Sequence, residues 1–383
     1  MSALTQPPAP AAAAKQAVFG KPLRFHWSLS QAGNPFRRAV RAAELSGQPS
    51  FEAQLELCQC ADEQGIDSLL MAIGFTRPDP ILLSTCLGLK TQRVKFMVAC
   101  RPGLISPAAF VQQINTLSLL VDGRVHINMV GGHTPRELQY YGDWLPRAER
   151  YARLDEFLTA CRAFWEADGH EVNFAGRYYQ IENGRLPTPF STNGVRRPEI
   201  YLGGNSEESA ALAIRHADCL WRFAEPPESL APKIAPVIQA RKEVGLLVSL
   251  IARPTRKEAV QAAYDLIGQF GEKARDAQRS FERHTDAAAF ESTYALARKS
   301  STDWATPTLW TGAVPFLGAP AIALVGSADE IASALLEYKA IGITQFLFTG
   351  WPDAEEMTFF GREVVPLVRA REALGAGALE VAP

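Results

Sequence analysis

Charged and polar side chains stand at the ends of several apolar, strand-like stretches of this sequence. Arg101 follows VKFMVAC, Arg77 comes shortly after DSLLMA, and His26 and Arg222 lie inside LRFHWS and DCLWRF. Arginine recognises carboxylates and phosphates, and histidine exchanges protons near neutral pH. The pattern predicts a site for an anionic ligand that is assembled from several strand ends.

A second signal is the segment YLGGNSEESAAL, residues 201–212. Its two glycines permit close backbone approach at a strand end, and Asn205 can cap the helix that follows, with Glu208 completing a capping pattern. Free N–H groups at a helix start attract anions, so Gly204, Asn205 and Ser206 could hold a cofactor phosphate. The alternative is a capped helix that binds nothing. The sequence contains neither GxGxxG nor GxxxxGK[ST], which argues against the common dinucleotide and triphosphate loops.

Alternating strand and helix patterns are expected to position these groups. The predicted strands are 23–28, 67–72, 94–100, 124–130, 198–203, 218–223, 244–252 and 343–349. The predicted helices are 51–64, 79–88, 106–121, 148–167, 206–216, 227–243, 256–270 and 354–369. Eight strand-helix units favour an α/β fold of the closed (β/α)8 TIM barrel type, with an open, doubly wound sheet as the alternative. In a barrel the active site lies at the C-terminal ends of the strands.

The predicted organisation is one barrel domain over residues 21–370. Residues 1–20 are Pro- and Ala-rich and predict a disordered leader, and residues 371–383 predict a short tail. Residues 271–325 interrupt the strand-helix rhythm before the last strand. An insertion of that length is usually functional or disordered, and we expect a lid over the barrel mouth.

Composition excludes several classes of function. The 383 residues are 47% hydrophobic, and 39 Lys and Arg stand against 41 Asp and Glu, for a net charge of −2. That balance argues against nucleic-acid or membrane-surface partners, and without an apolar span or signal-peptide pattern it predicts a cytoplasmic protein. Cys58 and Cys60 form only a CxC without a second cluster, so no metal site is expected. His126 is expected to be a hydrogen-bonded core histidine.

The segments VACRPGLISP, INMVGGHTPRELQYYGD, AERYARLDEFL, YLGGNSEESAALA and FLFTGWPDAEE occur in this order. From about Leu23 to Val368 the chain resembles the bacterial luciferase-like flavin monooxygenases, and it is most similar to their alkanesulfonate monooxygenase branch. The resemblance implies a barrel with an extended segment before the last strand, which uses reduced FMN from a separate NAD(P)H:flavin reductase. It also implies activation of O2 as a flavin peroxide, and a homodimer or homotetramer.

The resemblance assigns flavin-binding roles to particular residues. Asn128 matches an asparagine that touches the flavin, Arg150 and Tyr151 match a pair near the ribityl phosphate, and Ser206 matches the serine of the phosphate loop. Ala99 and Cys100 match the strand edge against which the flavin ring packs. The full set of expected contacts is Met71, Ala72, Ala99, Cys100, Asn128, Glu137, Arg150, Tyr151, Gly204, Asn205 and Ser206.

The chain departs from the sulfonate branch where that branch holds its substrate. The aligned positions contain Gln31, Arg77, Leu247 with Ser249, Leu317 and Trp351 in place of the branch's characteristic side chains. Arg77 and Arg222 supply replacement charge, so the substrate can still be an anion that is held differently. The catalytic candidates are His26, Arg77, His133, Arg222 and Trp351, with His26 the first choice for proton transfer. An apolar mouth of Trp27, Phe75, Trp221, Phe223 and Trp351 is expected to exclude water.

The resulting hypothesis is a two-component monooxygenase that oxygenates a small organic substrate with reduced FMN and O2. Two alternatives stay open: a deazaflavin (F420)-dependent oxidoreductase on the same barrel, and a flavin-binding homologue without catalysis.

Overall fold

The computed structural model describes residues 20–29, 51–75, 77–131, 135–299 and 302–380. The predicted leader, apart from Gly20, lies outside this part of the chain, as do Gln31 and His133.

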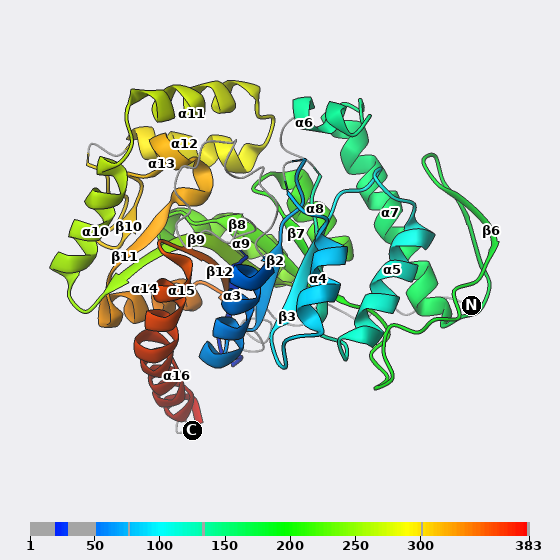
Figure 1. Ribbon diagram of the computed structural model, residues 1–383, viewed down its shortest axis with the longest axis horizontal. Helices are drawn as coiled ribbons and strands as arrows, with labels where there is room; N and C mark the ends of the chain where they lie inside the picture. The colour runs from blue at the N-terminus through cyan, green and yellow to red at the C-terminus, as the bar shows by residue number, and fades with distance from the viewer. Residues whose placement is uncertain (1–19, 30–50, 76, 132–134, 300–301, 381–383) are drawn as a thin grey trace.

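Eight parallel strands close into a barrel (Figure 1). They are β1 (Arg24–Ser28), β2 (Ser68–Met71), β3 (Lys95–Cys100), β4 (Val125–Met129), β7 (Glu199–Gly203), β8 (Cys219–Phe223), β9 (Glu243–Arg253) and β12 (Ile343–Gly350). Each pairs with the next in this order, and β12 pairs with both β9 and β1, which closes the ring. The predicted (β/α)8 barrel is therefore confirmed, and the open sheet is excluded.

Helices surround the barrel, and several of them begin at a residue whose side chain caps the helix. They are α3 (Phe51–Gln64), α4 (Pro80–Gly88), α5 (Pro107–Leu120), α7 (Arg147–Ala167), α8 (Glu207–His216), α9 (Pro227–Gln239), α10 (Arg256–Gly268) and α14 (Ala328–Ala340). Asp79 caps α4 by accepting from Ile81 N and Leu82 N, and Ser106 caps α5. Such caps satisfy backbone donors that a helix leaves free at its start.

Side-chain alternation divides the buried residues between two surfaces of the barrel wall. One cluster fills the barrel interior: Leu70, Met97, Ala99, Tyr201, Cys219, Trp221 and Leu347. The larger cluster lies between the strands and the helices, and it includes Phe25, Met71, Cys100 and Phe348. Neighbours in sequence thus face opposite ways, as the two-residue period of a strand requires.

The insertion before the last strand is more structured than the sequence pattern indicates. It contains α11 (Glu272–His284), α12 (Ala288–Lys299), β10 (Leu309–Trp310), α13 (Val314–Leu317), a 3-10 turn (Ala319–Ala321) and β11 (Ala323–Ser327). β11 pairs in parallel with the second half of β9, outside the closed ring, and leads into α14. Neither β11 nor α14 was predicted, because the insertion was expected to lead directly into the last strand-helix unit.

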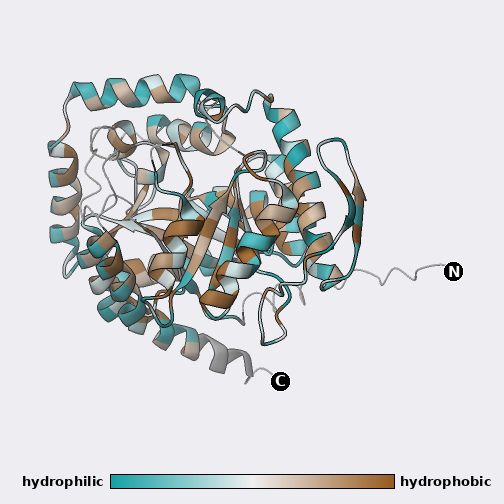
Figure 2. Cartoon of the chain, turned by 45° about the vertical axis from the view of Figure 1, so that its right-hand side comes forward, coloured by the Kyte–Doolittle hydropathy of each residue, from teal (hydrophilic) through white to brown (hydrophobic). Residues whose placement is uncertain are grey.

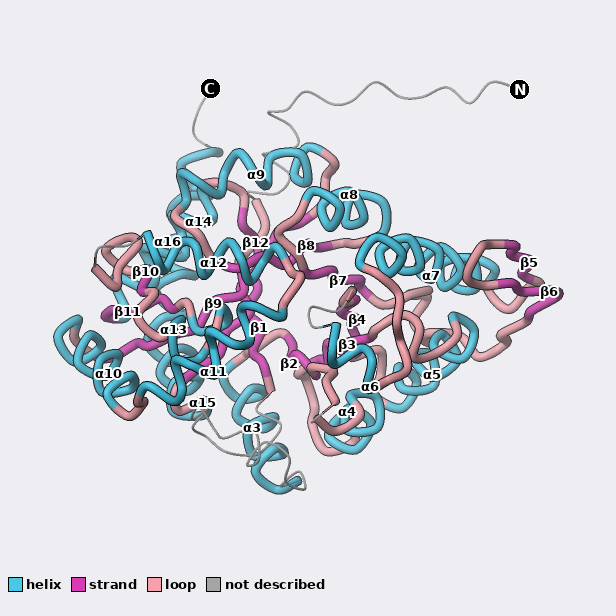
Figure 3. The backbone as a smooth tube through the Cα atoms, turned by 90° about the horizontal axis from the view of Figure 1, so that it is seen from above, coloured by secondary structure: helices cyan, strands magenta, loops and turns pink. Residues whose placement is uncertain are grey.

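The inserted helices lie over the C-terminal ends of the strands. Figures 1 and 3 show α11, α12 and α13 at this end in two perpendicular views. α11 has no buried residue and is largely hydrophilic in Figure 2, so it forms the outermost layer. The ring of Phe290 on α12 meets that of Phe223 on β8 at 5.5 Å between centroids. The insertion therefore occupies the position expected of a lid, while its movement stays a prediction.

One hairpin was not predicted, and the helix predicted over 354–369 extends from Asp353 to Glu380 with a π-helical turn inside it. β5 (Val172–Ala175) and β6 (Gln180–Gly184) form an antiparallel hairpin that projects from the end of α7 (Figure 3). At the C-terminus, α15 (Asp353–Phe359), a π-helical turn (Phe360–Val364) and α16 (Val365–Glu380) run consecutively. The predicted tail is thus helical through Glu380, and Glu372 in it accepts from Leu23 N at 2.8 Å.

Candidate active site

Buried polar groups without partners gather where β3 and β4 end. Asn128 on β4 is 7% exposed, and its Oδ1 accepts no hydrogen bond from the described residues. Arg101, the residue after β3, is 3% exposed, and its Nε and Nη1 likewise have no partner in the described chain. Leaving a buried polar atom unpaired costs about 1–3 kcal/mol, so such groups usually meet a ligand or water. These two side chains therefore mark a ligand-binding position.

Glu137 on α6 (Pro135–Tyr140) holds this region together. Its Oε2 accepts from Arg101 Nη2 at 3.1 Å, and its Oε1 accepts from Phe75 N at 2.8 Å. A side chain built at Gly74 would come within 3.2 Å of both Glu137 and Arg77. Glu137, which was predicted to touch the flavin, thus lies beside Arg77 and Arg101. Its bond to Arg101 orients that side chain.

The predicted phosphate loop has the expected local geometry. Ser206 caps α8 by accepting from Ser209 N at 3.2 Å, and a side chain at Gly204 would collide with Ser209 at 2.6 Å. The hydroxyl of Tyr151 lies 3.9 Å from that position, and a side chain at Gly203 would meet open space. Tyr151, Gly204 and Ser206 therefore lie close together, as predicted. Because Gly203 and Gly204 have no side chains, the backbone of this loop stays accessible to a ligand.

Asn205 connects this loop to the insertion. Its Nδ2 donates to Ser292 Oγ on α12 at 2.8 Å, while its Oδ1 is buried without a partner in the described chain. The prediction that Asn205 caps α8 is therefore wrong, because Ser206 occupies the cap position. A side chain held by the insertion and left with a free acceptor is suited to a ligand that lies beneath the insertion.

Arg150 does not point its charge at the loop. Its Nη2 donates to Asp286 at 2.6 Å, Nε to Gly131 O at 3.1 Å and Nη1 to Leu145 O at 3.1 Å. With every nitrogen engaged and 4% of the residue exposed, Arg150 joins α7 to the segment between α11 and α12. Arg150 therefore does not offer its charge to the predicted phosphate. Of the predicted pair, only Tyr151 borders the phosphate loop.

The expected flavin-packing residues separate by face. Ala99 belongs to the interior cluster, and Ala72 packs against it, so both can border a ligand in the barrel. Met71 and Cys100 belong to the outer cluster and face the helices. Burial also raises the pKa of the Cys100 thiol. The expectation that Met71 and Cys100 offer side chains to the flavin is corrected by the alternation of the strands.

His26 lies deep in the barrel rather than at its mouth. Its ring nitrogens are 2.7 Å from Ser68 Oγ and 2.9 Å from Gln345 Oε1, both near the N-terminal ends of their strands. Burial and the nearby positive charge of Arg24 lower the pKa of His26 to about 3. The predicted position at the mouth is therefore wrong. At neutral pH His26 is uncharged and hydrogen-bonded through both ring nitrogens, so it is a structural group.

Arg222 points away from the barrel interior, because its neighbours Trp221 and Phe223 take the inward positions. It lies 3.8 Å from Glu225, which also binds Lys233 of α9, and burial lowers its pKa. This orientation corrects the expectation of an Arg222 that faces the substrate. Arg77, in contrast, is exposed beside Glu137, and Asp79 caps α4 through its Oδ1.

The aromatic residues expected at the mouth have different surroundings. Trp27 is buried outside the barrel and donates to Asp353 at 3.0 Å, and Phe75 is 55% exposed beside Tyr140 and Tyr141. Trp221 fills the interior, stacked on Tyr201. Trp351 is 7% exposed and packs with Trp310 of the insertion, and Nε1 of each indole has no partner in the described chain.

The remaining aligned substrate positions are occupied by structural contacts. Ser249 donates to Pro320 O at 2.8 Å, Leu317 packs with the Trp351 cluster, and Leu247 borders the interior cluster. Sequence reasoning missed Asp286 and Ser292, which fasten the insertion to Arg150 and Asn205. No spacing rule could have found them, because the pairs are separated by 136 and 87 residues.

Comparison with known proteins places this geometry in a family. Residues 34–345 match the luciferase-like monooxygenases, and the chain belongs to that family. A riboflavin lyase solved with modified FMN and riboflavin has 19% identity over 92% of each chain, with a TM-score of 0.72. The EDTA monooxygenase from Chelativorans sp. BNC1 has 16% identity over 92% of this chain and 94% of its own, with a TM-score of 0.72.

A third similar structure uses a different coenzyme. The F420-dependent secondary alcohol dehydrogenase has 19% identity over 91% of this chain and 100% of its own, with a TM-score of 0.64. These structures share the fold. Within the described residues, no group of three or more His, Cys, Asp or Glu side chains is arranged to hold a metal ion, and no helix could cross a membrane.

Proposed function

We propose that the protein is a two-component, flavin-dependent monooxygenase that takes reduced FMN from a separate NAD(P)H:flavin reductase and oxygenates a small organic substrate with O2. The main observation in support is a set of buried polar atoms at the C-terminal end of the barrel that have no hydrogen-bond partner among the described residues. They belong to Arg101, Asn128 and Asn205. Membership of the monooxygenase family supports the same class of reaction.

The residues present fit a flavin mononucleotide. Gly203, Gly204 and Ser206 with the start of α8 suit the phosphate, and Tyr151 stands beside them. Arg101 and Asn128 suit the polar edge of the ring system, and Ala72 and Ala99 leave room beside it. Reduced FMN, when bound, supplies the electrons that activate O2.

The chain's own contribution is to bind, orient and exclude water. Glu137 fixes Arg101 through the 3.1 Å bond, so that its other nitrogens keep their direction. The insertion, bonded to Asn205 and Arg150, covers the C-terminal end and limits the access of water to reactive groups. Arg77, exposed beside this site, is our candidate for an anionic substrate group.

The decisive experiment is a binding and turnover comparison. The purified protein is titrated with FMN, photoreduced FMN and coenzyme F420 by fluorescence, and oxygen uptake is then followed with NAD(P)H, a flavin reductase and candidate organic anions. We expect reduced FMN to bind more tightly than the other two, and a substrate to raise product formation above uncoupled peroxide release.

Arg101→Met is the diagnostic variant, and Arg185→Met, which removes an exposed charge near the hairpin, is its control. Arg101→Met should weaken binding of reduced FMN about tenfold or more, the equivalent of about 1.4 kcal/mol, while Arg185→Met should leave it unchanged. Tight binding of F420 alone would favour the hydride-transfer alternative. Binding of FMN without oxygenation of any candidate would favour a homologue without catalysis.

A further inference from the structure

A depression lies at the end of the barrel where the strands begin, opposite the candidate active site. It has a volume of about 900 Å³ and is bordered by the segments that lead into β3, β4, β7, β8 and β9. Seven Lys and Arg side chains line it against four Asp and Glu, a surplus of three positive charges in a protein whose net charge is −2. The charge of this depression is therefore a local feature.

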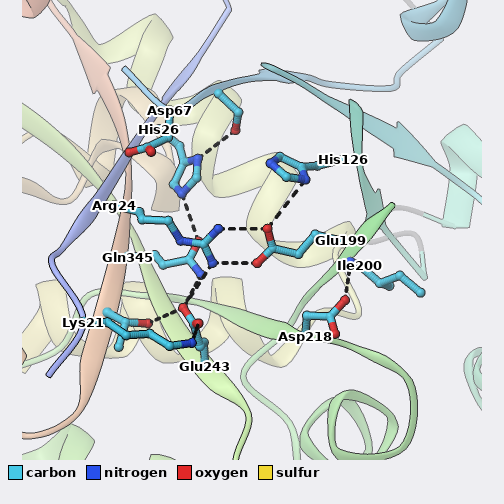
Figure 4. Close-up of polar contacts among 12 residues, drawn as sticks. Lys21, Arg24, His26, Asp67, His126, Glu199, Ile200, Asp218, Glu243 and Gln345 are labelled. Carbon is cyan, nitrogen blue, oxygen red and sulfur yellow. Dashed lines mark hydrogen bonds and ion pairs between the residues drawn. The ribbon is translucent and has the colours of Figure 1, made fainter. Parts of the chain in front are cut away.

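Three of the acidic groups already have cationic partners, and Figure 4 shows those of Glu199 and Glu243. Glu199 accepts from Arg24 at 2.5 and 2.8 Å, and Glu243 accepts from Lys21 at 2.6 Å and from Arg24 at 3.1 Å. Asp218 accepts two bonds from Arg197, at 2.6 and 2.8 Å. The carboxylates are thus committed to structural partners.

Several cations have no such partner. The side chains of Lys95, Arg241 and Lys242 form no hydrogen bond or ion pair with the described residues, although all three line the depression. Burial lowers the pKa of Lys242, in keeping with a lysine that is partly withdrawn from water. Asp218 attracts Lys242 and Asp67 attracts Lys95 through space, but neither carboxylate bonds to the lysine, so both ammonium groups remain available to an anion.

A buried polar atom faces the same place. His126 is 5% exposed and lines the depression, and its Nδ1 has no hydrogen-bond partner in the described chain, with Glu199 at 3.6 Å. The hydrogen bond expected of a core histidine is therefore missing at this nitrogen. A buried nitrogen that has Glu199 only at ion-pair distance, beside cations without direct bonds, favours a ligand at this place.

We propose that this depression binds a small organic polyphosphate of the size and charge of a nucleoside diphosphate. Three cations without a direct bond match about three negative charges, and Lys side chains are suited to phosphate as point charges. Phe190 and Pro198 add apolar wall for the remainder of the ligand. The site lies at the other end of the barrel from Arg101 and Asn128, so it is separate from the proposed flavin position.

Isothermal titration with ADP tests the proposal, with AMP and tripolyphosphate as further probes. The diagnostic variant is Lys95→Met with Lys242→Met. The matched control is Lys257→Met with Lys273→Met, which removes the same charge from exposed positions on α10 and α11. We expect ADP to bind the wild type, to bind the diagnostic variant at least about tenfold more weakly, and to bind the control normally.

Three measurements make the outcome decisive. Circular dichroism melting and FMN titration show that the diagnostic variant is folded, and ADP titration in the presence of saturating FMN shows whether the ligands share a site. Undisturbed ADP binding under FMN supports the proposal, and tighter binding of tripolyphosphate than of AMP supports recognition through charge. Absence of ADP binding at millimolar concentration, equal binding by both double variants, or competition with FMN would each overturn it.

Discussion

The guanidinium of Arg150 donates to the carboxylate of Asp286 at 2.6 Å, and this pair fastens α7 to the turn between α11 and α12. The arginine is 4% exposed and also holds Gly131 O and Leu145 O, so the insertion is tied to the loop that follows β4. This pair and the bond between Asn205 and Ser292 both connect the insertion to the C-terminal end of the barrel.

Asp286→Ala should loosen the insertion. Removing the acceptor leaves a buried guanidinium nitrogen unpaired, which should lower the free energy of unfolding by about 1–3 kcal/mol. Trypsin should cleave after Arg279 and Arg283 on α11 faster than in the wild type. Asp276→Ala is the control, because Asp276 forms only an exposed pair with Arg279. Equal cleavage rates for wild type and Asp286→Ala would show that the pair does not hold the insertion.

Ser206→Asp should discriminate between FMN and riboflavin. Aspartate caps a helix about as well as serine, so α8 should persist, but a negative charge at its start should repel a phosphate. FMN affinity should fall by at least about tenfold while riboflavin affinity changes little. Ser327→Asp, at the cap of α14, is the matched control and should alter neither. Equal losses of both flavins would place the phosphate elsewhere.

Glu356 should make stability depend on pH. Burial raises its pKa to about 7, from an ordinary value of 4.5. The folded state then retains a proton that the unfolded state has released, so stability should fall as pH rises from about 4.5 to about 7, by up to about 3 kcal/mol. Denaturant titrations at several pH values should show a flatter profile for Glu356→Gln. The exposed neighbour substitution Glu355→Gln should leave the slope unchanged.

Gly245→Ala should strain the barrel interior. A side chain at Gly245 would come within 2.1 Å of the Trp221 ring, which is stacked on Tyr201 and has little room to move. Overpacking of this kind should lower the free energy of unfolding by about 1–3 kcal/mol. Gly268→Ala at the end of α10, where a side chain would meet open space, should instead be neutral or gain about 0.5 kcal/mol. A melting temperature equal to wild type for Gly245→Ala would contradict the packing seen here.

The sequence by itself determined the barrel, because strand periodicity and helix caps are local properties. All eight barrel strands were located within a few residues, and Ser206, Tyr151 and Asn128 were assigned to the end of the barrel where they lie. Pairing β12 with both β9 and β1 follows once eight buried strands alternate with helices. Local spacing therefore predicted the architecture, and the family resemblance assigned Tyr151 and the other flavin-binding residues.

Only the tertiary structure decided which of the charged residues face the site. His26 and Arg222 have suitable chemistry, but the depth of a side chain in the barrel and the face on which it lies depend on strand register. A register shift of one residue moves every side chain of the strand to the opposite face. Arg150 meets Asp286 across 136 residues, and Lys95 on β3 and Lys242 just before β9 line one depression without any shared motif. Such contacts are products of folding, because distant segments are brought together only by the packed core.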